Sequence, residues 1–420
     1  MAKSDLIAVL DIGTYKVVCF IAFIGVDKKI EVKGIGHQFS QGIKSGIITD
    51  VGKAESCILA AINSAEKMAG ENIDEVVINI SGSVLDSYSV EVELPVSGHE
   101  ITQKDVSNII NTGYSNFPSA DREVIHSITM DYTIDNLESI SNPIGMYGDK
   151  LQTDIHIISS SVTAKKNLVS CLAKCHIDVS SLTASPYMSG ISTLSEDEKK
   201  IGAIQIDIGA GTTSISVFKN GYCIYLSSIN VGGNHITMDI ARGLSISLEY
   251  AERIKTIYGT VVATDKDKYE KIDIPITELQ SDIEDEAILG VGDSYLSKAL
   301  LTSIIKPRME EILEMVKEDI EKSGFYTQTG PRVVFSGGGS QLMGLKELAG
   351  HIFNKHIRIG KPILFEGMAE SVKGPAFSTI VGMLIYISNE IEEKHNSASL
   401  EMKGKSGMSN KLVKWFKDNF

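Results

Sequence analysis

Two stretches of the chain share one hydrophobic pattern. Residues 6–23 (LIAVLDIGTYKVVCFIAF) and residues 201–218 (IGAIQIDIGAGTTSISVF) each pass from an apolar segment through Asp-Ile-Gly into a second apolar segment. Apolar segments joined by a glycine turn predict a β-hairpin. The two Asp-Ile-Gly steps lie 196 residues apart. We therefore predict a duplicated fold of two related halves, each opened by a hairpin, with a cleft between them.

A separate module interrupts the first half. Apolar and polar residues alternate over 88–94, 128–134 and 151–157, which is the period of a half-buried strand. Thr102–Asp105 forms a loose capping box before an apolar helical repeat. The pattern predicts a β-α-β-β module inserted at residues 84–163.

The predicted division of the chain follows from these patterns. Lys394–Asn410 (KHNSASLEMKGKSGMSN) is rich in Ser, Gly and Lys and lacks core-forming periodicity, which predicts a flexible linker. Asp239–Tyr258 predicts one helix, and Tyr295–Ser323 a long one that Pro307 should kink or restart. The division is a first half of residues 1–83, 164–200 and 375–393, an inserted module of 84–163, a second half of 201–374 with an upper subdomain at 238–328, a linker of 394–410 and a terminal helix of 411–420.

Composition and charge limit the classes of function. Of 420 residues, 43% are apolar and 22% are charged, which indicates globular domains. The net charge of −14 argues against nucleic-acid binding, which needs a basic surface. We expect no secretory signal and no membrane-spanning helix, because no apolar stretch reaches the ~20 residues that a bilayer requires. The five cysteines include no Cys-x-x-Cys pair, so reduced thiols are expected; Cys171 and Cys175 are either metal ligands or, better supported, buried thiols.

The turns of both predicted hairpins carry residues suited to phosphate. Glycine lets backbone N–H groups approach an anion closely, and threonine hydroxyls add donors. Lys16 can reach a phosphate as a point charge. Asp11 and Asp207 each end a strand, where a carboxylate can hold hydrated Mg²⁺. The candidate residues are Asp11, Gly13, Thr14, Lys16, Asp207, Gly209, Gly211, Thr212 and Thr213; the alternative is a pair of ordinary tight turns.

A third glycine cluster, Gly337-Gly338-Gly339, follows a predicted apolar strand. It is neither a Walker A loop nor a dinucleotide fingerprint, because it lacks their spacing and the Lys-Ser/Thr step. Glycines here would let a flat base lie against the backbone, but a turn that starts a helix fits equally well. Glu252 and Lys255, three apart on one predicted helical face, suit a ribose or a base edge, or else form a solvent-exposed pair.

These motifs, in this order and spacing, resemble the actin-like ATPase superfamily. Within it the chain is most similar to the FtsA family of bacterial cell-division proteins, on residues 231–244 (VGGNHITMDIARGL), 251–255 (AERIK) and 305–308 (IKPR). The resemblance covers roughly residues 5–393 and the C-terminal tail. It implies an α/β, two-lobed actin-like fold of duplicated ribonuclease H-like halves, a small α+β insertion and a C-terminal amphipathic helix.

The resemblance also implies ATP and Mg²⁺ between the halves. The turn residues above would surround the phosphates, Asp11 and Asp207 would hold Mg²⁺ through water, and Gly233, Asn234, Glu252, Lys255, Gly338 and Gly339 would surround the nucleoside. Tyr15, also in the first turn, departs from the small residue usual there, so its side chain is expected to point away from the phosphates. No pattern identifies a water-activating residue, so no catalytic residue is assigned and ATP hydrolysis is expected to be slow at most.

The last ten residues have two faces when wound as a helix. Apolar side chains fill one arc and lysines most of the other, which is the pattern of a helix lying in a membrane surface. Residues 401–420 carry a net charge of +3 against −17 for residues 1–400, so anionic lipid is the expected partner. The alternative is a terminal helix packed on its own domain. The candidate membrane residues are Lys411, Leu412, Val413, Lys414, Trp415, Phe416, Lys417 and Phe420.

Further partners are implied by the resemblance. FtsA-like proteins bind the C-terminal peptide of the tubulin-like FtsZ, and Arg308 and, more weakly, Lys298 match that contact. Self-polymerisation, other division proteins and a place on the cytoplasmic face of the membrane at the division site are also implied. Two alternatives remain: a small-metabolite kinase of the superfamily, which would need a substrate pocket with a catalytic acid, and a pilus-assembly actin homologue, against which the tail and the Pro-Arg step argue.

Overall fold

Each half of the chain forms a five-stranded sheet, and the two sheets have the same strand order. From edge to edge the first contains β3 (Ile30–Phe39), β2 (Lys16–Ile24), β1 (Asp5–Ile12), β6 (Glu75–Ile80) and β11 (Asp178–Ala184). The second contains β14 (Tyr222–Ile229), β13 (Thr213–Lys219), β12 (Ala203–Ile208), β17 (Arg332–Ser336) and β18 (His356–Ile359). In both, three antiparallel strands are followed by two parallel ones. The duplication predicted from the hairpins is confirmed.

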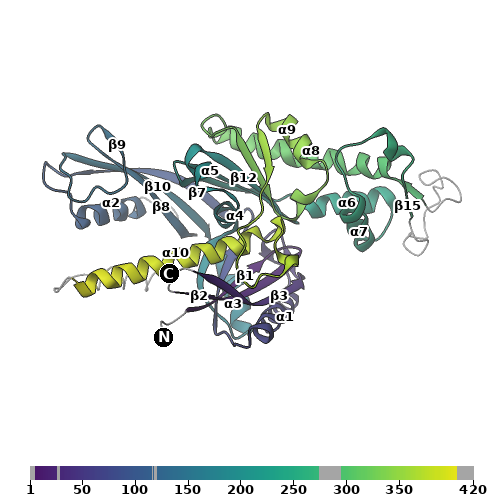
Figure 1. Cartoon of the computed structure of the whole chain (residues 1–420), viewed down its shortest axis with the longest axis horizontal. Helices are drawn as coiled ribbons and strands as arrows, with labels where there is room; N and C mark the ends of the chain where they lie inside the picture. The colour runs from purple at the N-terminus through teal and green to yellow at the C-terminus, as the bar shows by residue number, and fades with distance from the viewer. Residues whose placement is uncertain (1–4, 26–28, 116, 118–120, 274–294, 404–420) are drawn as a thin grey trace.

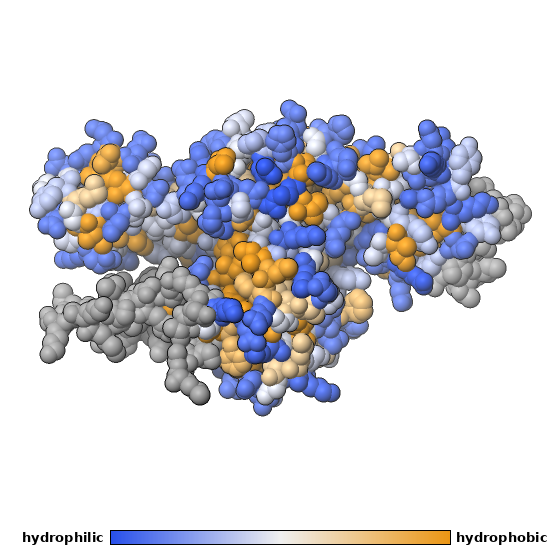
Figure 2. All heavy atoms as spheres, in the orientation of Figure 1, coloured by the Kyte–Doolittle hydropathy of each residue, from blue (hydrophilic) through white to orange (hydrophobic). Residues whose placement is uncertain are grey.

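The computed structural model describes residues 5–25, 29–115, 117, 121–273 and 295–403. In Figure 1 the first half lies below the second and the inserted module extends to the left. The helices α6 (Gly233–Leu244) and α7 (Leu248–Tyr258) and the strand β15 (Lys271–Asp273) lie at the right. Figure 2, in the same orientation, shows hydrophilic side chains over most of the module and the second half, with apolar ones gathered near the middle. Among the described residues, no helix is both long and apolar enough to cross a membrane.

The hairpin strands β1 and β2 of the first sheet are largely apolar because both of their faces are buried. Leu10, Val17 and Cys19 face the core beneath α1 (Val51–Ala69) and α3 (Val162–Lys174), while Val9 and Phe20 face α10 (Ser378–Lys403). A strand covered on both faces reads as a continuous apolar run, which explains why the first hairpin lacks alternation. All five cysteines lie in the described part of the chain and are free and buried, as predicted.

Two helices connect the halves, α4 (Ser185–Thr193) and α10. They cross closely: a β-carbon added at Gly382 of α10 would lie 1.9 Å from the Met188 backbone oxygen of α4. The remaining elements are β4 (Ile43–Lys44), β5 (Ile47–Ile48), α5 (Glu196–Ile201), η1 (Asp265–Lys268), β15 (Lys271–Asp273), β16 (Tyr295–Ser297), η3 (Gly338–Gln341), α9 (Leu345–Phe353), η4 (Glu370–Val372) and η5 (Pro375–Phe377).

The inserted module is a four-stranded sheet with one helix. It comprises β7 (Leu85–Pro95), α2 (Gln103–Ser115), β8 (Arg122–Ile134), β9 (Leu137–Ile140) and β10 (Lys150–Ser161), in the sheet order β7-β10-β8-β9. The predicted β-α-β-β order is confirmed except for β9, whose four residues are too few to show a period.

The module contacts both halves. On the first half, His126 Nε2 accepts the Ala184 N–H at 3.0 Å. On the second, the Tyr222 hydroxyl donates to Asp131 Oδ1 at 2.9 Å, and the Ser87 hydroxyl donates to the Leu226 backbone oxygen at 2.8 Å. Any movement between the halves therefore changes these contacts.

The single helix predicted over Asp239–Tyr258 is wrong. α6 (Gly233–Leu244) ends at Ser245, whose φ of 52° is left-handed, and α7 (Leu248–Tyr258) begins after Ser247. The Ser247 hydroxyl accepts the Tyr250 N–H, and serine in that position favours the start of a new helix.

Pro307 does not restart α8 (Lys298–Lys322), which runs through it as one helix. A proline inside a helix costs about 3 kcal/mol, because it lacks an N–H and crowds the preceding turn. On both sides of it α8 is buried in the core of the second half, through Leu301, Ile305, Met309 and Leu313. Tertiary packing therefore outweighs the local preference.

The backbone of α10 is helical to Lys403, so the flexible linker predicted over 394–410 is wrong in its first part. KHNSASLEMK contains no Pro or Gly before Gly404, so a helix already packed on the first half can continue at little cost. The rest of the linker and the terminal helix at 411–420 lie outside the described residues and remain predictions.

Candidate functional site

The turns of the two hairpins have the same backbone geometry. Ile12 pairs with Val17 and Ile208 with Thr213, so each turn holds four residues. Gly13 N–H donates to the Lys16 oxygen at 3.0 Å, and Gly209 N–H donates to the Thr212 oxygen at 2.9 Å. Residues 13 to 16 therefore correspond one by one to residues 209 to 212. Lys16 of one turn corresponds to Thr212 of the other, and Tyr15 corresponds to Gly211.

Asp11, at the end of β1, is held by a neighbour on β6. Asn79 Nδ2 donates to Asp11 Oδ1 at 2.7 Å, and Asn79 Oδ1 accepts the Ile12 N–H at 2.6 Å. Burial raises the pKa of Asp11 to about 6, against the lowering effect of the Lys16 charge; the charge of Asp207 adds to the rise. The second oxygen of Asp11 has no hydrogen-bond donor among the described residues.

Asp207 occupies the equivalent position at the end of β12. The hydroxyls of Ser189 on α4 and Ser336 on β17 donate to Asp207 Oδ2 at 2.7 and 2.9 Å. Burial raises the pKa of Asp207, while these two hydrogen bonds and the charge of Lys16 lower it. The two carboxylates are close enough for the charge of Asp207 to raise the pKa of Asp11.

The two carboxylates fit a hydrated magnesium ion. In each carboxylate, one oxygen accepts hydrogen bonds from protein side chains. The other oxygen accepts none from the described residues. Mg²⁺ takes oxygen ligands and keeps several waters. Within the described ranges no group of three or more His, Cys, Asp or Glu side chains could hold a metal ion, so water and phosphate would supply the other ligands.

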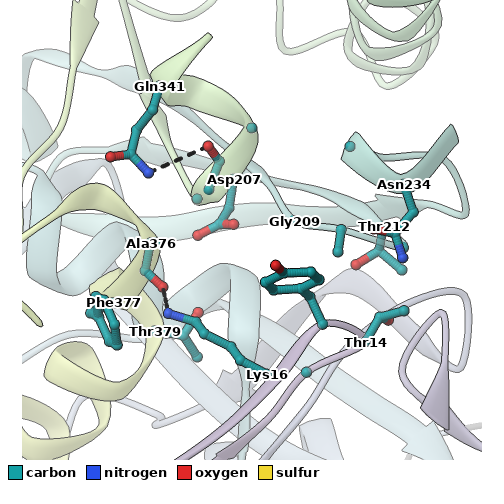
Figure 3. Close-up of a pocket in the computed structure, with 18 of the residues that line it drawn as sticks. Thr14, Lys16, Asp207, Gly209, Thr212, Asn234, Gln341, Ala376, Phe377 and Thr379 are labelled. Carbon is teal, nitrogen blue, oxygen red and sulfur yellow. Dashed lines mark hydrogen bonds between the residues drawn. The ribbon is translucent and has the colours of Figure 1, made fainter. Parts of the chain in front are cut away.

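Lys16 places a cation beside the carboxylates. Its Nζ donates to the Ala376 backbone oxygen at 2.6 Å and lies 3.2 Å from the centre of the Phe377 ring. Burial lowers the pKa of Lys16 to about 8, and the charges of Asp11 and Asp207 oppose that shift. Figure 3 shows the Lys16 side chain pointing from β2 towards Ala376, with Thr14 and Thr212 farther along the cavity.

The start of α6 packs on the second turn. Gly233 N–H donates to the Gly209 oxygen at 2.9 Å and Asn234 N–H to the Ala210 oxygen at 2.8 Å. Nearby, Lys255 Nζ donates to Glu252 Oε2 at 2.6 Å. The two side chains of this pair are only 14% and 25% exposed, so the solvent-exposed alternative is wrong. Burial lowers the pKa of Lys255, and Glu252 opposes the shift.

All three glycines of the third cluster line the cavity, and Gly337 is also packed closely on β12. Gly337 has a left-handed φ of 81°, and a β-carbon there would lie 2.4 Å from the Ile208 backbone oxygen. Its N–H donates to the Pro375 oxygen at 3.0 Å. At Gly338 an added β-carbon would meet nothing within 4 Å, and Gly338 lines the cavity. The cluster therefore does more than start a helix.

These elements enclose a cavity of about 710 Å³, a size typical of cofactor sites. Thr213 is not among the residues that line it, and its hydroxyl donates to the Val231 oxygen at 2.7 Å. Tyr15 also lines the cavity, and its orientation relative to phosphates stays a prediction. The predicted residues that the cavity brings together are Asp11, Gly13, Thr14, Tyr15, Lys16, Asp207, Gly209, Gly211, Thr212, Gly233, Asn234, Glu252, Lys255, Gly338 and Gly339.

Several residues that line the cavity or hold its carboxylates were missed from the sequence. Asn79 reaches Asp11 across 68 positions, and Ala376 reaches Lys16 across 360, so no local pattern could connect them. Ser189 orients Asp207 without belonging to any motif. Of these residues, Ser336 could have been found from the sequence, because it directly precedes the glycine cluster.

The predicted partner residues lie outside the cavity, and both are already paired. Arg308 Nε and a second guanidinium nitrogen donate to the two Asp239 carboxylate oxygens at 2.6 and 3.2 Å, and Arg308 also bonds Glu311. Lys298 Nζ donates to Glu270 Oε2 at 2.9 Å and lies 3.6 Å from Asp267. A partner carboxylate would have to compete with these groups. The predicted membrane residues at 411–420 lie outside the described residues.

Comparisons with known proteins give the family and the fold. The model "Cell division protein FtsA" matches residues 204–382, and "SHS2 domain inserted in FTSA" matches residues 82–159. The cell division protein FtsA of Agrobacterium fabrum is 37% identical over 431 residues, covering 100% of this chain and 96% of its own length.

Two solved structures share the fold at low sequence identity. The PilM-PilN type IV pilus biogenesis complex has a TM-score of 0.61 at 15% identity, covering 90% of this chain and 98% of that one. MreB 5 of Spiroplasma citri bound to AMPPNP has a TM-score of 0.55 at 14% identity, covering 94% and 99%. At such identities the likeness shows the fold alone, which is the predicted two-lobed, actin-like α/β fold.

Proposed function

The chain belongs to the FtsA family of actin-like cell-division proteins, and on this premise we propose that it binds ATP between its halves and ties FtsZ filaments to the membrane. The observation that carries the nucleotide proposal is the pair of matched turns, with Asp11, Asp207 and Lys16 gathered where they meet. The relatives are named cell division proteins, and the fold neighbour MreB 5 is described with a bound ATP analogue.

Different residues of the chain would bind the phosphates, the base and the magnesium ion of ATP. The turn N–H groups and the hydroxyls of Thr14 and Thr212 suit phosphate oxygens, because glycine turns present backbone donors at close range. Lys16 supplies positive charge against the phosphates. Gly338 leaves room for a flat base. Magnesium, held through water by Asp11 and Asp207, would neutralise charge on the phosphates.

We propose that ATP acts mainly as a conformational and polymerisation ligand. The inserted module, which contacts both halves, suits this role because its contacts respond to movement between them. We keep as proposals the division into two halves and a module, self-assembly into actin-like filaments, and docking of other division proteins.

We propose that the last ten residues anchor the chain to the cytoplasmic face of the membrane at the division site. Deleting residues 411–420 should leave nucleotide binding unchanged and abolish sedimentation with vesicles that contain phosphatidylglycerol. Replacing Lys411, Lys414 and Lys417 by glutamine should weaken vesicle binding about 100-fold, because each lysine near an anionic surface contributes about 1 kcal/mol.

A vesicle sedimentation assay at constant ionic strength checks this prediction. Vesicles of phosphatidylcholine alone are the control, since they lack the negative charge that the lysines need. Undiminished sedimentation of the deletion variant would show that the anchor lies elsewhere in the chain.

We propose that FtsZ binds near Arg308 on α8, with Arg308 pairing a carboxylate of its C-terminal peptide. Because Asp239 already holds the guanidinium, Arg308→Gln should weaken peptide binding about tenfold, whereas Asp239→Asn should strengthen it several-fold by freeing the guanidinium. Arg308→Glu is a poor test, since it would place three carboxylates together.

Fluorescence anisotropy with a labelled FtsZ C-terminal peptide measures both variants. Lys322→Gln, at the other end of α8, is the matched control and should bind like the wild type. Equal affinity of Arg308→Gln and wild type would remove Arg308 from the contact.

No specific observation favours either alternative function. The likeness to the pilus complex stands at 15% identity, far below the 37% shared with a cell-division relative over the whole chain. A small-metabolite kinase needs a catalytic acid beside a second substrate, and both buried acids at the turns suit the metal.

A further inference from the structure

The first turn carries a bulky side chain at a position where the second turn has no room for one. By register, Tyr15 corresponds to Gly211. A β-carbon added at Gly211 would lie 2.6 Å from Thr14 Oγ1 and 3.1 Å from the Ser45 nitrogen, so the second turn has no room for a side chain. The first turn instead presents a phenol at this position. The cavity is therefore asymmetric, with one bulky group contributed by the first half.

Tyr15 lies at the rim of the cavity and is supported from β3. Its side chain lines the cavity and is 41% exposed. The ring meets Phe39 edge-on, with 5.5 Å between centroids, and Phe39 is itself 68% exposed. The backbone also joins the two segments, because Ser40 N–H donates to the Tyr15 oxygen at 2.9 Å. An exposed aromatic pair held in this way gives the rim a firm apolar edge.

The second half lies within electrostatic reach of the phenol. Burial raises the pKa of Tyr15, and the charge of Glu252 on α7 raises it further, so the hydroxyl stays neutral and able to donate. Glu252 also lines the cavity and is bonded to Lys255 and Thr237, which fix it in place. Tyr15 on one half and Glu252 on the other therefore face the same space, where the proposed nucleotide lies.

We propose that Tyr15 covers the mouth of the cavity over a bound nucleoside triphosphate and so lengthens the time for which the nucleotide stays bound. This rests on the nucleotide binding proposed above. A ring over the ligand adds contact area and excludes water, and contacts made in the bound state slow dissociation more than they change association. The ring performs this role, and the hydroxyl adds little to it.

The test is the dissociation rate of N-methylanthraniloyl-ATP in the presence of Mg²⁺, measured by stopped-flow displacement with excess ATP. Tyr15→Ala should release the analogue about tenfold faster, which corresponds to about 1.4 kcal/mol of lost contact. Tyr15→Phe should remain within about twofold of the wild type, because it keeps the ring. Phe39→Ala, which removes the support of the ring, should give an intermediate rate.

Tyr269→Ala is the matched control, since Tyr269 is 84% exposed and does not line the cavity. Thermal melting without nucleotide separates this role from a structural one: Tyr15→Ala should melt like the wild type. Equal dissociation rates for Tyr15→Ala and wild type would overturn the proposal while leaving nucleotide binding intact. A wild-type chain that binds no analogue would instead overturn the proposed function.

Discussion

Gly337→Ala is expected to destabilise the protein by about 3 kcal/mol, whereas Gly338→Ala is expected to leave the stability almost unchanged. A methyl group at Gly337 would lie 2.4 Å from both Ile208 O and Asp207 Oδ1, in a left-handed backbone that alanine adopts at a cost. The group that it meets is strand backbone, which cannot move aside. At Gly338 the same methyl group meets nothing within 4 Å.

The two neighbouring substitutions should separate folding from binding. Gly338→Ala places its methyl group in the cavity, so it should weaken ATP binding about tenfold if the base lies against this turn. Urea denaturation gives the free energy of unfolding, and titration calorimetry gives the affinity. Equal stabilities for the two variants would contradict the close approach of Gly337 to β12. Unchanged ATP affinity in Gly338→Ala would place the base elsewhere.

Lys16→Met should weaken ATP binding about 100-fold, or about 2.7 kcal/mol, while the protein remains folded. The variant keeps an unbranched side chain at this position but loses the cation that lies over the Phe377 ring, between the carboxylates and the proposed phosphates. A hydrogen bond from a charged donor is worth about 1.5–3 kcal/mol, and here it would also offset the negative charges of Asp11 and Asp207.

Titration calorimetry with ATP and Mg²⁺ measures this loss. Lys44→Met makes the same chemical change at an exposed lysine outside the cavity and should bind like the wild type. A Lys16→Met variant with wild-type affinity would mean that the phosphates lie away from the first turn.

The sequence predicted those parts of the site that repeat or that are bounded by glycine. Asp11 and Asp207 were found because each sits between an apolar run and a glycine turn, and the same pattern appears twice. Their supporting residues follow no such rule. Asn79, Ser189 and Ala376 reach the site through chain topology, so only the folded structure brings them to the turns.

Local patterns failed where packing or a single side chain decided the outcome. The cap of Ser247 begins a second helix where the sequence pattern predicts one continuous helix. The helix α8 continues past Pro307 because its neighbouring residues are buried in the core. In the site itself, no local pattern pairs Tyr15 with Phe39, which follows 24 positions later and contacts its ring.

A crystal structure of the full chain grown with ATP and Mg²⁺ would locate the nucleotide that we propose between the two matched turns. We expect a triphosphate held between residues 13–16 and 209–212, with Lys16 beside it and the base near Gly338. A triphosphate bound elsewhere, with both turns contacting only water, would rule out the proposed site.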